Sequence, residues 1–154
     1  GYRIGWAVSP QFHADIARAK FYASVACPTL QQLVLARYYA SGGYDRYLRR
    51  VRTTLAANSQ HTIDAITRYF PQGTRLARPS GGVVLWIELP RTVDSVELFR
   101  TALASRIGVT PGIVFSAKAD YRNYIRVSCG WHWTPTMERA IEKLGRLVAG
   151  MAKA

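Results

Sequence analysis

The sequence predicts an α+β fold in which a few strands form a mostly antiparallel sheet with helices packed on one face. Segments 83–89 and 124–129 are short runs rich in β-branched and aromatic residues, which is typical of strands. The segments around them have apolar residues at helical spacing, begin at capping residues and end at glycine or proline. We expect residues 44–154 to form this small domain.

The small domain is expected to start with the longest helix, over residues 44–70, which Pro71 and Gly73 end. A strand follows Gly81-Gly82, and a helix over 95–105 has Asp94 as its N-cap. A short extended element at Val109 turns at Pro111-Gly112 before the second strand. Thr134 and Pro135 then start a last helix that runs to Ala152.

Residues 1–43 show a different pattern. The apolar run 2–8 predicts a strand buried on both faces, and such strands lie inside larger sheets. Helices are expected over 11–27, with Ser9 as N-cap, and over 29–39, with Thr29 as the cap and Gly42-Gly43 as the stop. We therefore expect residues 1–43 to be an orphan strand and connecting helices from a larger domain that is mostly outside this sequence.

Composition says more about the size and cellular compartment of the protein than about its function. The 154 residues are enough to bury one core, and no apolar run reaches the length of about 18–20 residues of a membrane span. Cys27 and Cys129 lie in element-like runs, which indicates buried thiols of a reducing compartment and a cytoplasmic protein. The net charge of +12 permits nucleic acid, an acidic partner or anionic ligands, and does not choose among them.

Two arginines are the leading candidates for a site. Arg3 and Arg126 each lie inside a short apolar run of β type. A guanidinium in such surroundings is costly unless an anion pairs with it. The pattern predicts a pocket that binds two anionic groups, although an acidic neighbour of each arginine would satisfy it equally well.

Other polar and aromatic positions are weaker candidates. Phe115 and Ser116 follow a turn and could line the mouth of a pocket. Plain turns explain Gly81-Gly82 and Pro111-Gly112 better than close approach to a ligand. The three histidines, His13, His61 and His132, lack metal-ligand spacing. The aromatic segment Trp131-His132-Trp133 follows a strand and indicates packing or a domain contact.

The start of the long helix carries a basic face that allows a nucleic-acid-binding module as a competing interpretation. Arg46, Arg49 and Arg50 share this face, Arg37 and Arg52 lie nearby, and Tyr44 and Tyr47 are interleaved. No helix-turn-helix or zinc-finger pattern is present, and the apolar spacing already gives this helix a core face. A solvated basic face, or contact with an acidic region, explains the cluster better.

Five segments, in this order, resemble the fold-type I pyridoxal-phosphate enzymes of the aspartate aminotransferase superfamily. They are GYRIGW (1–6), GYDRYLRRVR (43–52), SGGVVLWI (80–87), TPGIVFS (110–116) and YIRVS (124–128). The residues in these segments are most similar to those of the aminotransferase-like domain of MocR-type regulators of the GntR family, in which a winged-helix DNA-binding domain lies upstream. The resemblance covers essentially the whole chain, and implies the C-terminal small domain of a fold-type I aminotransferase, preceded by elements of the large domain.

The resemblance also implies roles for the two arginines. Arg3 matches the arginine that holds the phosphate of pyridoxal 5′-phosphate, and Arg126 matches the arginine that binds the α-carboxylate of an amino acid. The Schiff-base lysine is expected upstream of Gly1, so no catalytic residue and no activity are expected of this chain alone. A homodimer, DNA contact through a domain outside the chain, and no membrane association are implied. The alternative is a free-standing aminotransferase that moves an amino group between an amino acid and a 2-oxo acid.

Overall fold

A computed structural model describes residues 2–153. The chain divides into two compact units, Gly1–Arg49 and Arg50–Ala154. The division falls inside one long helix, α3 (Gly43–Tyr69). None of the helices within the described residues has the length and apolar character needed to cross a membrane.

The first unit contains α1 (His13–Ser24), α2 (Thr29–Ala40) and the start of α3, and neither α1 nor α2 has a buried residue. Residues 2–9 form no strand and residues 2–8 are mostly exposed, so the expected buried strand is wrong for this chain. A strand needs a neighbour for its backbone groups, and no described segment pairs with these residues. The helix expected from residue 11 begins at His13, with Phe12 rather than Ser9 at its N-cap.

The second helix also differs from expectation at its start. Pro28 is the N-cap of α2 and Thr29 is its first helical residue, so Thr29 does not cap it. The expected stop is confirmed, since α2 ends at Ala40 and Gly42 follows with a φ of 68°, a conformation that glycine adopts at little cost.

The second unit is built on a four-stranded antiparallel sheet with the order β1-β2-β4-β3. Its strands are β1 (Arg75–Leu76), β2 (Val84–Glu88), β3 (Thr110–Pro111) and β4 (Tyr124–Ser128). The central pair β2 and β4 confirms the two strands expected from the sequence. The strand β1 was not expected, because two residues are too few to show an alternating pattern.

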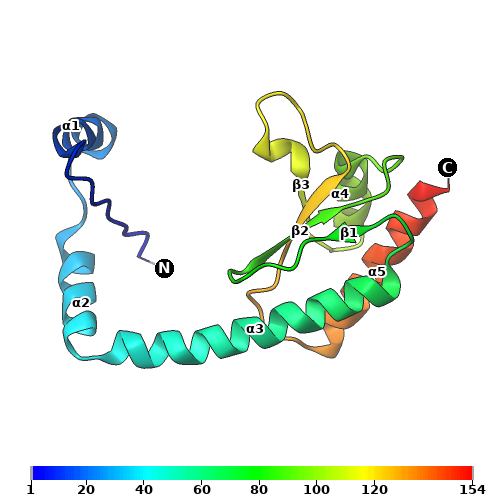
Figure 1. Cartoon of the computed structure of the whole chain (residues 1–154), viewed down its shortest axis with the longest axis horizontal. Coiled ribbons are helices and arrows are strands. Elements are labelled where there is room, and N and C mark those ends of the chain that lie inside the picture. Colours follow the sequence, from blue (N-terminus) through cyan, green and yellow to red (C-terminus); the bar gives the residue numbers. More distant parts are fainter. Residues whose placement is uncertain (1, 154) are drawn as a thin grey trace. The chain divides into compact units, whose positions relative to one another are not determined.

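One face of this sheet forms the core. Leu85 pairs with Val127 and Ile87 pairs with Ile125 across β2 and β4, and all four side chains are buried. They pack with buried residues of the C-terminal half of α3, of α4 (Ser95–Ala104) and of α5 (Pro135–Ala152). Figure 1 shows these helices beside the sheet. The helical contributors to the core are Ile63, Ala65, Ile66, Leu98, Ala102, Ile141, Leu144 and Val148. The expected α+β fold with helices on one face is confirmed.

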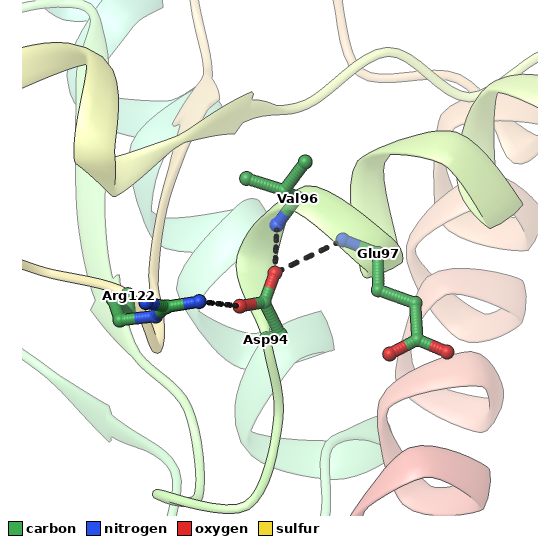
Figure 2. Close-up of polar contacts among 4 residues, drawn as sticks. All are labelled: Asp94, Val96, Glu97 and Arg122. Carbon is green, nitrogen blue, oxygen red and sulfur yellow. Dashed lines mark hydrogen bonds and ion pairs between the residues drawn. The ribbon is translucent and has the colours of Figure 1, made fainter. Parts of the chain in front are cut away.

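Both expected N-caps of the second unit are present. The Asp94 carboxylate accepts hydrogen bonds from the backbone N–H groups of Val96 and Glu97, and Nη2 of Arg122 donates to its other oxygen (Figure 2). The Thr134 hydroxyl accepts from the N–H of Met137 at the start of α5. Each cap satisfies backbone donors that the helix itself leaves unpaired.

Candidate functional site

The face of the sheet opposite the core carries the candidate site. Because side chains alternate along a strand, the residues between the core positions of β2 and β4 point to this second face. Trp86 pairs with Arg126, and Arg126 pairs with Thr110, so these three residues form one row across β2, β4 and β3. Glu88 and Tyr124 form the next row.

Arg126 lies half-buried in an aromatic surround. Its guanidinium carbon Cζ lies over the ring of Phe115, 5.0 Å from the ring centre. Its Nη2 donates a long hydrogen bond of 3.5 Å to the hydroxyl of Thr110. The Phe115 ring meets Trp86 edge to face at 5.4 Å, and Trp86 stacks on Tyr124 at 5.6 Å. The arginine is therefore held in place by an aromatic ring and a hydroxyl, both uncharged.

No carboxylate within residues 2–153 forms an ion pair with Arg126. Glu88 is an acidic residue on the same face, and its Oε2 lies 3.7 Å from Nη1 of Arg75 on β1. Burial raises the pKa of the Tyr124 phenol, and the negative charge of Glu88 raises this pKa further. The charge of Glu88 therefore acts on Arg75 and Tyr124, and the salt bridge considered for Arg126 is not formed.

The loop after β3 closes this site at one edge. A short 3₁₀ helix, η1 (Gly112–Phe115), places Phe115 over the sheet. A Cβ on Gly112 would lie 2.7 Å from Cβ of Tyr124 and 2.9 Å from Cβ of Tyr121, so only glycine allows this close approach. Close packing, and not the turn alone, accounts for Gly112.

The hydroxyl of Ser116 forms its hydrogen bonds within the same loop. It donates to the carboxylate of Asp120 at 3.0 Å and accepts from the backbone N–H of Lys118 at 3.1 Å. Phe115, which the sequence placed beside it as a candidate, is the residue of the pair that contacts the arginine.

Arg3 lies in the first unit, in the segment before α1, and its side chain is exposed. Its φ of 56° falls in the left-handed region, which is uncommon for a residue with a Cβ. It forms no ion pair with any described residue. The two predicted arginines thus belong to different units of the chain.

The remaining candidates have packing or surface positions. His61 stacks on Trp133 with ring centres 5.6 Å apart, whereas His13 and His132 are exposed. Gly82 has a φ of 98°, which supports the interpretation of Gly81-Gly82 as a turn. No group of three metal-ligating side chains is present within residues 2–153.

Two contributors to the site were missed from the sequence, Trp86 and Thr110. Both lie in the same row across the sheet as Arg126. The alternation of apolar and other residues in the two strands places Trp86 and Arg126 out of phase with their core neighbours. That signal assigns them to one face, but only the register places them opposite each other.

Comparison with known proteins gives the family. Residues 1–144 match the family "Aminotransferase class I and II". An uncharacterized HTH-type transcriptional regulator of Escherichia coli, YdcR, is 32% identical over 148 residues, which are 96% of this chain and 32% of the regulator. The 2-aminoadipate transaminase of Thermus thermophilus is 30% identical over 152 residues, 98% of this chain and 38% of the enzyme. The chain spans about a third of the length of these relatives.

Solved structures give the same result for the fold. An α-aminoadipate aminotransferase from Thermus thermophilus, complexed with N-(5′-phosphopyridoxyl)-L-leucine, matches 96% of this chain and 38% of its own, with a TM-score of 0.84 and 28% identity. A kynurenine aminotransferase from Pyrococcus horikoshii has the same TM-score at 22% identity, and matches 94% of this chain and 36% of its own. The Pyrococcus crystal contains PMP and the Thermus crystal contains N-(5′-phosphopyridoxyl)-L-leucine, and both compounds derive from pyridoxal 5′-phosphate, the cofactor that they support for this family. With residues 1–144 matched and this fold shared, the chain belongs to the aminotransferase class I and II family.

Proposed function

We propose that this chain is the C-terminal part of the aminotransferase-like effector domain of a MocR-type transcriptional regulator of the GntR family. In this role the parent protein binds pyridoxal 5′-phosphate and senses an amino acid or the cofactor itself. The similarity to two HTH-type regulators of Escherichia coli, 32% and 33% identical over 148 residues, supports the assignment.

The observation that carries the proposal is that Arg126 has no acidic partner in the described chain. Its guanidinium is half-buried on an aromatic face and pairs with no carboxylate of the described chain. A planar fork of N–H donors binds a carboxylate through two parallel hydrogen bonds. We assign Arg126 to the α-carboxylate of the amino-acid ligand.

Arg3 is the residue of this chain that we assign to the cofactor phosphate. Its exposed guanidinium has no ionic partner in the described chain, and its donor set matches phosphate oxygens. When bound, pyridoxal 5′-phosphate supplies an electron sink for an amine joined to it. The chain's own contribution is then to hold two anions, the phosphate at Arg3 and the carboxylate at Arg126.

The proposal extends to the organisation of the parent protein. Residues 1–43 would belong to the large cofactor-binding domain and residues 44–154 would form the small domain. The exposed apolar side chains of the first unit, which include Trp6, Phe21 and Leu30, fit a segment that other parts of the protein cover. The parent is proposed to be a cytoplasmic homodimer that contacts DNA through an upstream winged helix.

The test uses the full-length protein with its cofactor. Binding to the DNA upstream of its own gene is measured by fluorescence anisotropy while a panel of L-amino acids is added. The proposal expects at least one amino acid to change DNA affinity, and expects Arg126→Gln to abolish that response with DNA affinity itself retained. A protein without DNA binding, or with a response that Arg126→Gln leaves intact, contradicts it.

The second candidate is a free-standing aminotransferase, and the 30% identity to 2-aminoadipate transaminase favours it. It predicts steady transfer of an amino group from an amino acid to a 2-oxo acid by the full-length protein, without DNA binding. A nucleic-acid-binding module in this chain itself is the third candidate, since Arg46, Arg50 and Arg52 are exposed. It predicts that the isolated chain binds duplex DNA with an affinity that falls steeply as salt rises.

A further inference from the structure

The contact between Phe115 and Arg126 fixes an arginine without neutralising it. The cation lies over the ring at 5.0 Å, where the negative face of the aromatic quadrupole attracts it. An acidic partner would instead occupy the N–H donors that a ligand carboxylate needs. The ring leaves the formal charge of the guanidinium intact.

The hydrogen bond from Arg126 to Thr110 is weak. At 3.5 Å it is well beyond the usual length of an N–H···O bond. A bond of this length is easily exchanged for a carboxylate oxygen. Thr110 therefore supports the side chain of Arg126 without competing with an anion.

The Phe115 ring has an aromatic contact in addition to its contact with Arg126, although the residue is 46% exposed. It meets Trp86 edge to face at 5.4 Å, and it is the last residue of η1, a helix that begins at the closely packed Gly112. Trp86 lies in the strand register directly opposite Arg126. Trp86 thus contacts the Phe115 ring, and that ring in turn lies over the guanidinium of Arg126.

We propose that Phe115 is a positioning residue that orients the Arg126 guanidinium for a ligand carboxylate by a cation–π contact. Thr110 holds the same group in the absence of ligand. This inference rests on the proposed function, because it takes Arg126 as the carboxylate-binding residue. It adds a residue whose contribution is to prepare the arginine, and it requires an aromatic ring at position 115.

The test compares two ligands that differ only in the carboxylate. Full-length protein without cofactor is titrated with N-(5′-phosphopyridoxyl)-L-leucine and with its decarboxylated analogue, N-(5′-phosphopyridoxyl)-3-methylbutylamine. The ratio of their dissociation constants is the carboxylate preference. We expect a ratio of about 10 to 100 for the wild type, as for a hydrogen-bonded charged group.

Phe115→Leu is expected to lower this preference by about 3- to 10-fold, the range of a partly desolvated cation–π contact. Phe115→Tyr keeps the ring and should restore the wild-type ratio. Affinity for the decarboxylated analogue should stay unchanged in both variants. Val114→Ala, at an exposed position of the same 3₁₀ helix, is the matched control and should leave both affinities unchanged.

The outcomes test the role of Arg126 and the role of Phe115 separately. A wild-type ratio near one contradicts the proposed function of Arg126 itself. A high wild-type ratio that Phe115→Leu leaves unchanged overturns only the role of Phe115. If Phe115→Leu unfolds at the assay temperature, Phe115→Met replaces it, because methionine fills a similar volume without an aromatic face. Phe115→Met is then expected to lower the carboxylate preference by the same factor.

Discussion

Asp94 and Arg122 lie 28 positions apart in the chain, yet Nη2 of Arg122 lies 3.2 Å from Oδ2 of Asp94. The other oxygen, Oδ1, accepts from the backbone N–H groups of Val96 at 2.8 Å and Glu97 at 3.2 Å. One carboxylate therefore caps α4 and anchors the segment that leads into β4 (Figure 2).

Removing this cap should weaken the second unit. Asp94→Ala is expected to lower the free energy of unfolding by about 1 kcal/mol, because two backbone donors of α4 lose their acceptor. Arg122→Gln removes only the ion pair, which is exposed at the arginine, and should cost no more than about 0.5 kcal/mol. Urea denaturation of the two variants measures the difference. An equal loss in both would show that the ion pair, and not the cap, carries the effect.

The same carboxylate should make stability depend on pH in a defined direction. Burial raises the pKa of Asp94, but the hydrogen bonds from Glu97 and Val96 and the ion pair with Arg122 outweigh burial, so its pKa lies below the ordinary value of 3.8. The ionised form is thus favoured in the folded state, and its contribution is complete above the unfolded pKa. The contribution is lost as pH falls through the lower, folded pKa.

Asp94→Asn tests this pH dependence, because asparagine retains a capping oxygen but carries no charge. Denaturation midpoints of Asp94→Asn and the wild type should differ at pH 7 and converge in acid, below the folded pKa of Asp94. A difference that stays constant from neutral pH into strong acid would contradict the assignment.

Gly145 should not tolerate a side chain. It lies on α5 where that helix meets the end of α3, and a Cβ there would lie 2.8 Å from the carbonyl carbon of Tyr69 and 3.1 Å from Cδ2 of Phe70. Gly145→Ala is expected to destabilise the fold by about 1–3 kcal/mol through overpacking. Gly150→Ala, on the same helix with open space around it, should be neutral or stabilising by up to about 1 kcal/mol. Thermal melting compares the pair, and equal shifts would show that α5 and α3 pack less closely.

The second unit should fold without the first. Within residues 2–153, the hydrophobic core cluster lies entirely between Ile63 and Ala152. A variant that begins at Tyr44 is therefore expected to keep a single cooperative unfolding transition at the wild-type midpoint. A variant that ends before Leu147 loses the buried Val148 and is the control that should fail. Loss of cooperativity in the first variant would place residues 2–43 in the core.

In the full-length protein, Arg126→Ala and Arg3→Ala should have opposite effects. Arg126→Ala is expected to weaken binding of the amino-acid ligand by about 2–4 kcal/mol, with cofactor affinity nearly unchanged. Arg3→Ala should weaken retention of pyridoxal 5′-phosphate first. Absorbance of the bound cofactor and calorimetric titration of the ligand separate the two. Equal loss of cofactor in both variants, with ligand affinity intact, would contradict these separate roles of the two arginines.

The local elements of this protein could be predicted from the sequence alone. Strands β2 and β4, the caps at Asp94 and Thr134 and the ends of α3 each depend on residues adjacent in the chain, whose backbone preferences are local. The order of the five motifs also pointed to the family that residues 1–144 match. The same local rules mislead for residues 2–8, because an apolar run becomes a strand only where another strand pairs with it.

Only the tertiary structure decided what surrounds Arg126. Phe115 and Thr110 reach it through the register of β3 against β4 and through the path of the loop after β3, which Gly112 allows to pack closely. The register of β1 against β2 places Glu88 opposite Arg75, and Arg126 has no acidic partner in the described chain. Contacts between strands depend on alignment in space, and local sequence patterns encode the face of a residue but not its neighbour in the adjacent strand.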